Sequence, residues 1–278
     1  MIFCGFNLED KIPDHSSICR FRKSLIEKDL EAKLLREVNH QIESYGFSLK
    51  TGSIVDASLI KAHSRPQRTE YIEIEPVGDD QAETDEDKPL NQESEQHKLT
   101  KEEAESYRFI STDSKDPDAK WIKKGKKSVF GYKAHMAVDS QHGLIQNIES
   151  TPANIHDSKQ FNSLVSGIVL DKDAPIYGDK GYASDKNNKA IIKKDCQPRI
   201  MHKKYKRDKN WENKKIFNKL ISKIRYKVER TFGNLHQVFC IGETPYVGNR
   251  KTDYFLKMKA IVYNLKRFIK LEIVQFAG

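Results

Sequence analysis

Three acidic residues stand in settings that suit the ligands of a divalent metal ion. Asp179 lies between two glycines after the apolar run Ala174–Tyr177, where the backbone can closely approach a metal or a phosphate. Asp56 also ends an apolar run, and Glu229 lies in a stretch with helical periodicity. Mg²⁺ prefers carboxylate oxygens, and two such ions can activate water and stabilise the leaving oxygen of a phosphodiester. Any one of these acids is more simply explained as a solvated residue at the end of an element, but together they indicate a metal site.

The charge of the chain is unevenly distributed. Its 278 residues include 49 Lys and Arg against 40 Asp and Glu, a net charge of +9. Residues 70–118 hold 17 acidic and five basic residues, a balance of −12, so the remainder of the chain carries +21. Such a basic remainder is typical of a protein that contacts phosphate backbones, although a soluble protein with many surface lysines is the alternative.

Five segments, taken in their order along the chain, carry a family resemblance. They are GSIVDASLI at 52–60, KSVFGYKAH at 127–135, TPANIHD at 151–157, YGDKGY at 177–182 and VERTFG at 228–233. In this order they resemble the DDE transposases of bacterial insertion sequences, specifically the insertion-sequence-five group. The resemblance covers residues 6–270.

The resemblance implies a fold, a site and a reaction. The fold is a ribonuclease-H-like α/β fold, a mixed sheet flanked by helices. Asp56, Asp179 and Glu229 are the implied metal-binding triad for Mg²⁺, with Mn²⁺ as a substitute. The reaction is cleavage and transfer of DNA strands at the ends of a mobile element, in which water attacks first and a 3′-hydroxyl second.

The chain departs from this family in two places. The family signature is Tyr, two residues, Arg, three residues, Glu, six residues and Lys; this chain keeps Arg225 and Glu229 but has Ser222 and His236 at the two outer positions. Arg225 would orient Glu229 or grip a phosphate, and the alternative is an ordinary ion pair between residues four apart on a helix. Members of the group generally have a longer N-terminal helical region, so we expect a shortened chain. A catalytically weak or inactive DNA-binding remnant is therefore the alternative function.

Several cations are candidates for contact with DNA. They are Lys126, Lys127, Lys133, Lys203, Lys204, Lys206, Arg207, Arg230 and His236. Cations with interleaved aromatic residues, such as the run before Trp211, can contact phosphates and unpaired bases. The alternative is that these cations lie in loop tips and contact only solvent. We expect His236 to face the bound DNA and to gain charge as the pH falls through about 6.5.

The expected partner is double-stranded DNA, namely the terminal inverted repeats of an element and the target DNA, bound by a homodimer. No Gly-x-x-x-x-Gly-Lys motif is present, so no nucleotide cofactor is expected. Four dispersed cysteines argue against a zinc knuckle or a disulfide framework, and no apolar run is long enough to span a membrane. The expected location is the cytoplasm, at the nucleoid. His156-Asp157 could be a metal pair, but an N-cap with its neighbour is the favoured interpretation.

The elements that must position these residues follow from hydrophobic periodicity and turn residues. Four parts are predicted: an N-terminal helical segment over 1–48 as a partial DNA-binding region, a catalytic domain over 49–66 and 119–240, a flexible acidic insertion over 67–118, and a C-terminal helical extension over 241–278. Helices are predicted over 15–46, with Ser16 or Ser17 as N-cap, and over 100–108, 157–165, 184–193 and 211–238. Strands are predicted over 51–60, 129–138, 144–148, 174–177 and 198–201.

The helix predicted over 211–238 carries the third acid. Its apolar residues recur at helical spacing and predict one buried stripe, made of Phe217, Ile221, Ile224, Val228, Leu235 and Phe239. Arg225, Glu229 and His236 follow the same spacing along the border of that stripe. We therefore expect Glu229 to sit at the rim of the core and to point into a cleft.

Overall fold

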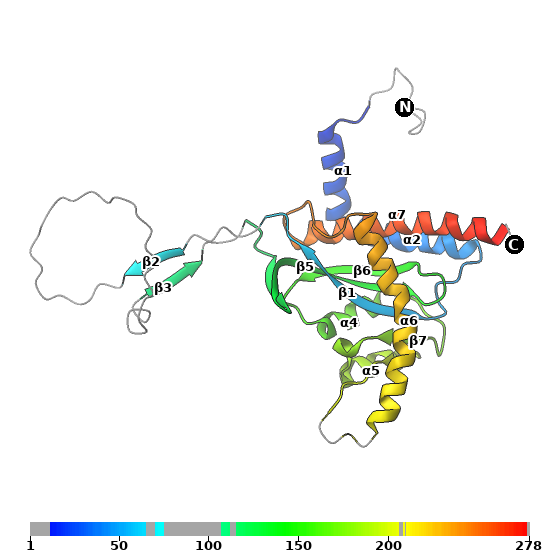
Figure 1. Cartoon of the computed structure of the whole chain (residues 1–278). Coiled ribbons are helices and arrows are strands. Elements are labelled where there is room, and N and C mark those ends of the chain that lie inside the picture. The colour runs from blue at the N-terminus through cyan, green and yellow to red at the C-terminus, as the bar shows by residue number, and fades with distance from the viewer. Residues whose placement is uncertain are drawn as a thin grey trace, which may run out of the picture. The chain divides into compact units, whose positions relative to one another are not determined.

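The computed structural model describes residues 12–64, 70–74, 107–111, 115–205, 208 and 210–276 (Figure 1). Contacts divide the chain into one unit of residues 1–64 with 116–278 and a second unit of residues 65–115. Within the described residues, no helix is long and apolar enough to cross a membrane.

A six-stranded mixed sheet forms the centre of the first unit. Its strands are β1 (Ser53–Lys61), β4 (Lys120–Lys124), β5 (Lys127–Asp139), β6 (Ile145–Pro152), β7 (Pro175–Gly178) and β8 (Gln197–Ile200). The order is β4-β5-β1-β7-β8, with β6 paired to β5. β1 is antiparallel to β5 and parallel to β7, and β7 is parallel to β8. The mixed sheet flanked by helices that the resemblance implies is thereby confirmed.

Helices cover both faces of this sheet, so β1 is buried on both sides. On one face, α6 (Trp211–Gln237) and α7 (Asn249–Phe276) contribute Val228 and Leu256 to a core that includes Ile54 of β1. On the other face, α4 (Asp157–Ser166) contributes Phe161 to a core that includes Val55 of β1, near α5 (Asp185–Lys193). Successive strand residues point to opposite faces, so Ile54 and Val55 serve different cores. Asp56 therefore lies on the face that α6 covers.

The N-terminal helices differ from the prediction in their N-cap. Two helices, α1 (His15–Glu27) and α2 (Leu30–Ser44), lie within the helical range predicted over 15–46, with a break at Asp29, whose φ is +49°. The N-cap is Asp14, not Ser16 or Ser17: its carboxylate accepts the backbone N–H of Ser17 at 2.6 Å. A carboxylate is favoured at this position because it also interacts well with the helix dipole.

The second unit contains an antiparallel pair, β2 (Glu70–Ile74) with β3 (Tyr107–Ser111). The helix predicted over 100–108 is therefore wrong at Tyr107 and Arg108, and its remaining residues lie outside the described part of the chain. The alternating apolar residues of 107–110 pair with those of 71–74, a long-range contact that a local pattern does not reveal.

Candidate active site

Strand pairing brings the two predicted aspartates together. In the parallel pair of β1 and β7, Ser53 lies opposite Ile176 and Ile54 opposite Tyr177. The same register continued by two residues sets Asp56, within β1, beside Asp179, which follows the last residue of β7. Open α/β sheets place their ligand sites where parallel strands end, and Asp179 occupies such a position. The sheet thus positions two carboxylates that are 123 positions apart in the sequence.

Asp56 is mostly buried and is held from two sides. Its Oδ2 accepts a hydrogen bond from Nη2 of Arg225 at 2.8 Å, and its Oδ1 accepts the backbone N–H of Ala57 at 2.9 Å. The side chains of Asp56 and Arg225 are 19% and 13% exposed. Burial raises the pKa of Asp56, Arg225 and the Ala57 N–H oppose that rise, and the nearby charge of Asp179 adds to it.

Arg225 reaches the sheet from α6. Its Nη1 lies 3.9 Å from Sδ of Met201, just after β8, and its Nε is buried without a hydrogen-bond partner among the described residues. A buried ion pair stabilises a protein little by itself, but loss of one partner leaves the other charge uncompensated. The described contact of Arg225 is therefore with Asp56, whereas the sequence suggested that it orients Glu229 or binds a phosphate.

Asp179 caps a single turn of 3₁₀ helix, η2 (Lys180–Tyr182). Its Oδ1 accepts the backbone N–H of Gly181 at 2.7 Å. A Cβ on Gly181 would lie 2.9 Å from that same oxygen and 3.6 Å from Oδ2 of Asp157. A side chain at this position would thus crowd the Asp179 carboxylate, and the sequence prediction of a tight exit after the strand identified this turn.

Glu229 lies one helical turn after Arg225 on α6, and its side chain is exposed. It makes no hydrogen bond or ion pair with any described residue. Among those residues, no three His, Cys, Asp or Glu side chains are grouped closely enough to hold a metal ion together. The structure therefore brings Asp56 and Asp179 together and leaves Glu229 at the solvent-facing border of the helix.

His236 lies farther along the same side of α6 and contacts β1. Its Nε2 is 2.8 Å from Oγ of Ser58, and the ring lines a pocket of about 510 Å³ together with Lys61 and Glu243. Burial lowers the pKa of His236, so its protonation is expected below the ordinary value of 6.5. The ring is half buried, and one of its two nitrogens is engaged with protein.

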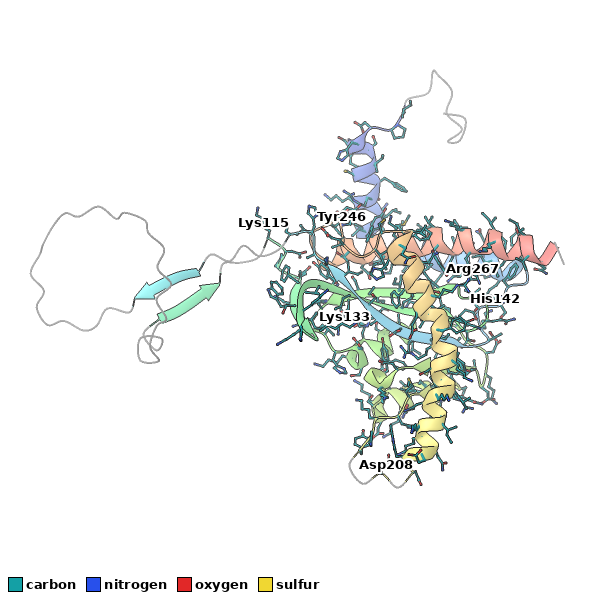
Figure 2. All side chains as sticks on the ribbon, in the orientation of Figure 1. Lys115, Lys133, His142, Asp208, Tyr246 and Arg267 are labelled. Carbon is teal, nitrogen blue, oxygen red and sulfur yellow. The ribbon has the colours of Figure 1, made fainter. Side chains whose placement is uncertain are left out.

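Lys133 differs from the other predicted DNA contacts because it is buried, near the centre of the molecule in Figure 2. Its Nζ donates to Oδ1 of Asp157 at 2.8 Å and to the carbonyl of Ile155 at 2.7 Å. This placement leaves little of its ammonium for DNA and ties β5 to the N-terminus of α4. His135, two residues along, donates or accepts at 2.9 Å with Oγ1 of Thr151, and burial lowers its pKa to about 4.

The remaining predicted cations are more accessible. Lys126, Lys127 and Arg230 are exposed, the first two at the turn between β4 and β5. Lys204 lies over the Trp211 ring at 5.7 Å, and Lys203 donates to the carbonyl of Ala183 at 3.3 Å. Lys206 and Arg207 lie outside the described residues.

Sequence reasoning missed two groups beside the aspartates. For His156-Asp157 an N-cap was favoured over a metal pair. His156 is indeed the N-cap, with Nδ1 accepting the N–H of Ser158 at 3.2 Å, and the Asp157 carboxylate lies near Gly181, beside Asp179. The hydroxyl of Tyr182 is buried without a hydrogen-bond partner among the described residues. Burial, together with the charges of nearby aspartates, raises its pKa well above 10. The TPANIHD and YGDKGY segments were the only signals for either residue.

Comparison with known proteins identifies the family of the chain. A family model described as "Transposase DDE domain" matches residues 47–265, and another, "Transposase domain (DUF772)", matches residues 1–24. The chain is 31% identical over 248 residues to the transposase for insertion sequence element IS1106 of Neisseria meningitidis serogroup B, across 88% of this chain and 75% of that relative. The matched range contains Asp56, Asp179 and Glu229. The chain therefore belongs to the DDE transposases of insertion-sequence elements.

Proposed function

We propose that this transposase uses Mg²⁺, or Mn²⁺ in its place, to cleave element-end DNA and to join the freed 3′-hydroxyl to target DNA. The observation that supports it best is the register of β1 and β7, which sets Asp56 beside Asp179 where β7 ends. We assign the chain to the insertion-sequence-five group on the order of its five sequence motifs.

The residues present fit a hard divalent cation. Asp56 and Asp179 offer carboxylate oxygens, and Mg²⁺ is commonly bound by one or two carboxylates together with substrate phosphates and water. The buried Tyr182 hydroxyl and Arg225 Nε have no partner among the described residues, and a hydrated ion would supply water to such groups. When bound, the ion would activate water and stabilise the charge that develops at phosphorus. Asp56 and Asp179 would hold it, and Glu229 would complete the site.

The protein residues have distinct tasks in this proposal. Arg225 keeps Asp56 ionised and oriented despite its burial, because an adjacent cation opposes the cost of desolvation. The N–H of Gly181 fixes one oxygen of Asp179. Glu229, on the exposed border of α6, approaches only when DNA is seated. The DNA partner comprises the terminal repeats and the target, held by a homodimer at the bacterial nucleoid in the cytoplasm.

The test is a nicking assay on supercoiled DNA that carries an element end. Activity should require Mg²⁺ or Mn²⁺, disappear with a chelator and disappear in Asp56→Asn. Asp171→Asn, which changes an exposed aspartate in the loop before β7, is the matched control and should retain full activity. Equal activity with and without the chelator would refute the proposal.

A DNA-binding remnant without turnover is the second candidate. Its support is the exposure of Glu229 and the absence of a three-residue metal group among the described residues. Such a remnant would bind element ends with wild-type affinity in Asp56→Asn and would nick no DNA in either form. Metal titration followed by the nicking assay separates the two candidates.

A further inference from the structure

We propose that a basic pocket between the β5–β6 turn, α6 and α7 binds one phosphate group of the DNA backbone, apart from the phosphate at the catalytic aspartates. The pocket has a volume of about 110 Å³ and is lined by residues of all three elements. Water occupies about 30 Å³ per molecule in the liquid, so the space suits an anion of a few heavy atoms. DNA as the source of the phosphate rests on the function proposed above.

The charge of the pocket is of one sign. Lys227 and Arg230 line it from α6 and Arg267 from α7, and no described residue that lines it is acidic. The acid of the turn, Asp139, is fully buried, and its carboxylate accepts the backbone N–H groups of Gln141 and His142. Three cations without an acidic neighbour repel one another, and an anion between them relieves that repulsion.

The walls of the pocket are fixed before any ligand binds. Nζ of Lys227 donates to the carbonyl of Ser140, and Nε of Arg267 donates to the carbonyl of His142 at 3.0 Å. Figure 2 shows His142 and Arg267 next to each other. The hydroxyl of Tyr263 donates to the carbonyl of Gly143 at 3.1 Å. The turn is therefore clamped by both helices, and little ordering cost remains for binding.

Two of the three cations keep donors for a ligand. The terminal nitrogens of Arg267 make no hydrogen bond with the described residues, because its hydrogen bond to His142 uses Nε. Arg230 is exposed and makes no hydrogen bond or ion pair with them. Guanidinium groups bind phosphate oxygens through paired N–H donors, so this arrangement favours a phosphate over a neutral ligand.

The pocket borders the turn of α6 that carries the candidate site. Arg225 contacts Asp56, Glu229 follows one turn later, and Arg230 is the next residue. A helix rises about 1.5 Å per residue with about 3.6 residues per turn, so Arg225 and Arg230 are about 7.5 Å apart along the axis and about 140° apart around it. A phosphate in the pocket is therefore a different one from the phosphate at Asp56, on the neighbouring side of α6.

The test compares Arg230→Gln, Arg267→Gln and their double variant with Lys193→Gln, which removes the same charge from an exposed site on α5. Affinity for a random duplex is measured by fluorescence anisotropy across a range of salt concentrations. The double variant should bind about five- to tenfold more weakly, with a salt slope reduced by about 0.9, the value for one phosphate contact. Lys193→Gln should leave the slope unchanged.

Two further arms distinguish the ways in which the proposal can fail. If Arg230→Gln, whose side chain has no described partner to lose, and the double variant both keep the wild-type slope, the pocket does not bind DNA. If millimolar inorganic phosphate raises the melting temperature of the wild type only, while the slopes stay equal, the ligand is free phosphate and the DNA assignment is wrong. Asp56→Asn should lose nicking activity but keep the wild-type salt slope of DNA affinity. Retained nicking in that variant would refute the catalytic proposal without affecting the conclusion about the phosphate pocket.

Discussion

The edge of the sheet and the helix above it position their acidic residues in different ways. Asp56 and Asp179 are held by strand register, by a backbone N–H each and, for Asp56, by Arg225. Glu229, on α6, is exposed and has no hydrogen-bond or ion-pair partner among the described residues. Two of the three proposed metal ligands are thus preorganised by the backbone. We propose that a ligand positions Glu229, because nothing described in the protein fixes that carboxylate.

The largest expected effect is the loss of nicking activity when an acidic residue of either region is replaced. Asp56→Asn and Asp179→Asn should each lower the nicking rate at least 10³-fold, about 4 kcal/mol of transition-state stabilisation, because each removes a charged ligand. Glu229→Gln should lower it by a similar factor only if the helix closes onto the metal when DNA binds. Single-turnover nicking at saturating Mg²⁺ measures all three. Full activity in Asp179→Asn would remove that residue from the site.

A smaller effect concerns the link between the two regions. Arg225→Gln removes the cation that opposes the raised pKa of Asp56, so that pKa should rise further. A carboxylate binds a cation only when ionised, so the acidic limb of the nicking rate should move to higher pH. Arg225→Lys keeps the charge and should move the limb less. A pH–rate profile from 4.5 to 8 measures the shift, and an unmoved limb in Arg225→Gln would show that Arg225 does not control Asp56.

The preorganisation of Asp179 can be disturbed without removal of its charge. Gly181→Ala would place a Cβ 2.9 Å from the Asp179 carboxylate and should displace it, with a loss of about tenfold in nicking rate. Gly233→Ala is the matched control, because nothing lies within 4 Å of a Cβ there and alanine favours the helix. Similar rates for the two variants would mean that the position of Asp179 is adjustable.

The smallest effect is expected at His236, at the far end of the helix. Because burial lowers its pKa, the imidazole is neutral above about pH 6.5, and wild-type DNA affinity should be flat from there to pH 8 and rise only below. His236→Lys should raise affinity about two- to fivefold and flatten the acidic rise. Ser58→Ala, which removes the contact of the ring with β1, controls for ring position. A wild-type curve that stays flat to pH 5 would place His236 away from DNA.

The features that depend on local sequence pattern could be predicted from the sequence. Asp56 and Asp179 were identified because each ends an apolar run, and the long helix was predicted over 211–238 and observed over 211–237. The partners could not be predicted: Arg225 meets Asp56 across 169 positions, and Lys133 meets Asp157 across 24. Such pairs depend on how helices pack on the sheet. The charge of Lys133 suggested a contact with DNA, but its strand is buried on both faces.

We propose that Asp56 and Asp179 form a cation site before DNA binds, whereas Glu229 joins it afterwards. Mn²⁺ binding to the DNA-free protein can be measured by electron paramagnetic resonance of the free ion. We expect binding in the wild type, loss in Asp56→Asn and in Asp179→Asn, and an affinity within about twofold of wild type in Glu229→Gln. Equal loss in Glu229→Gln, or undiminished binding in both aspartate variants, would contradict it.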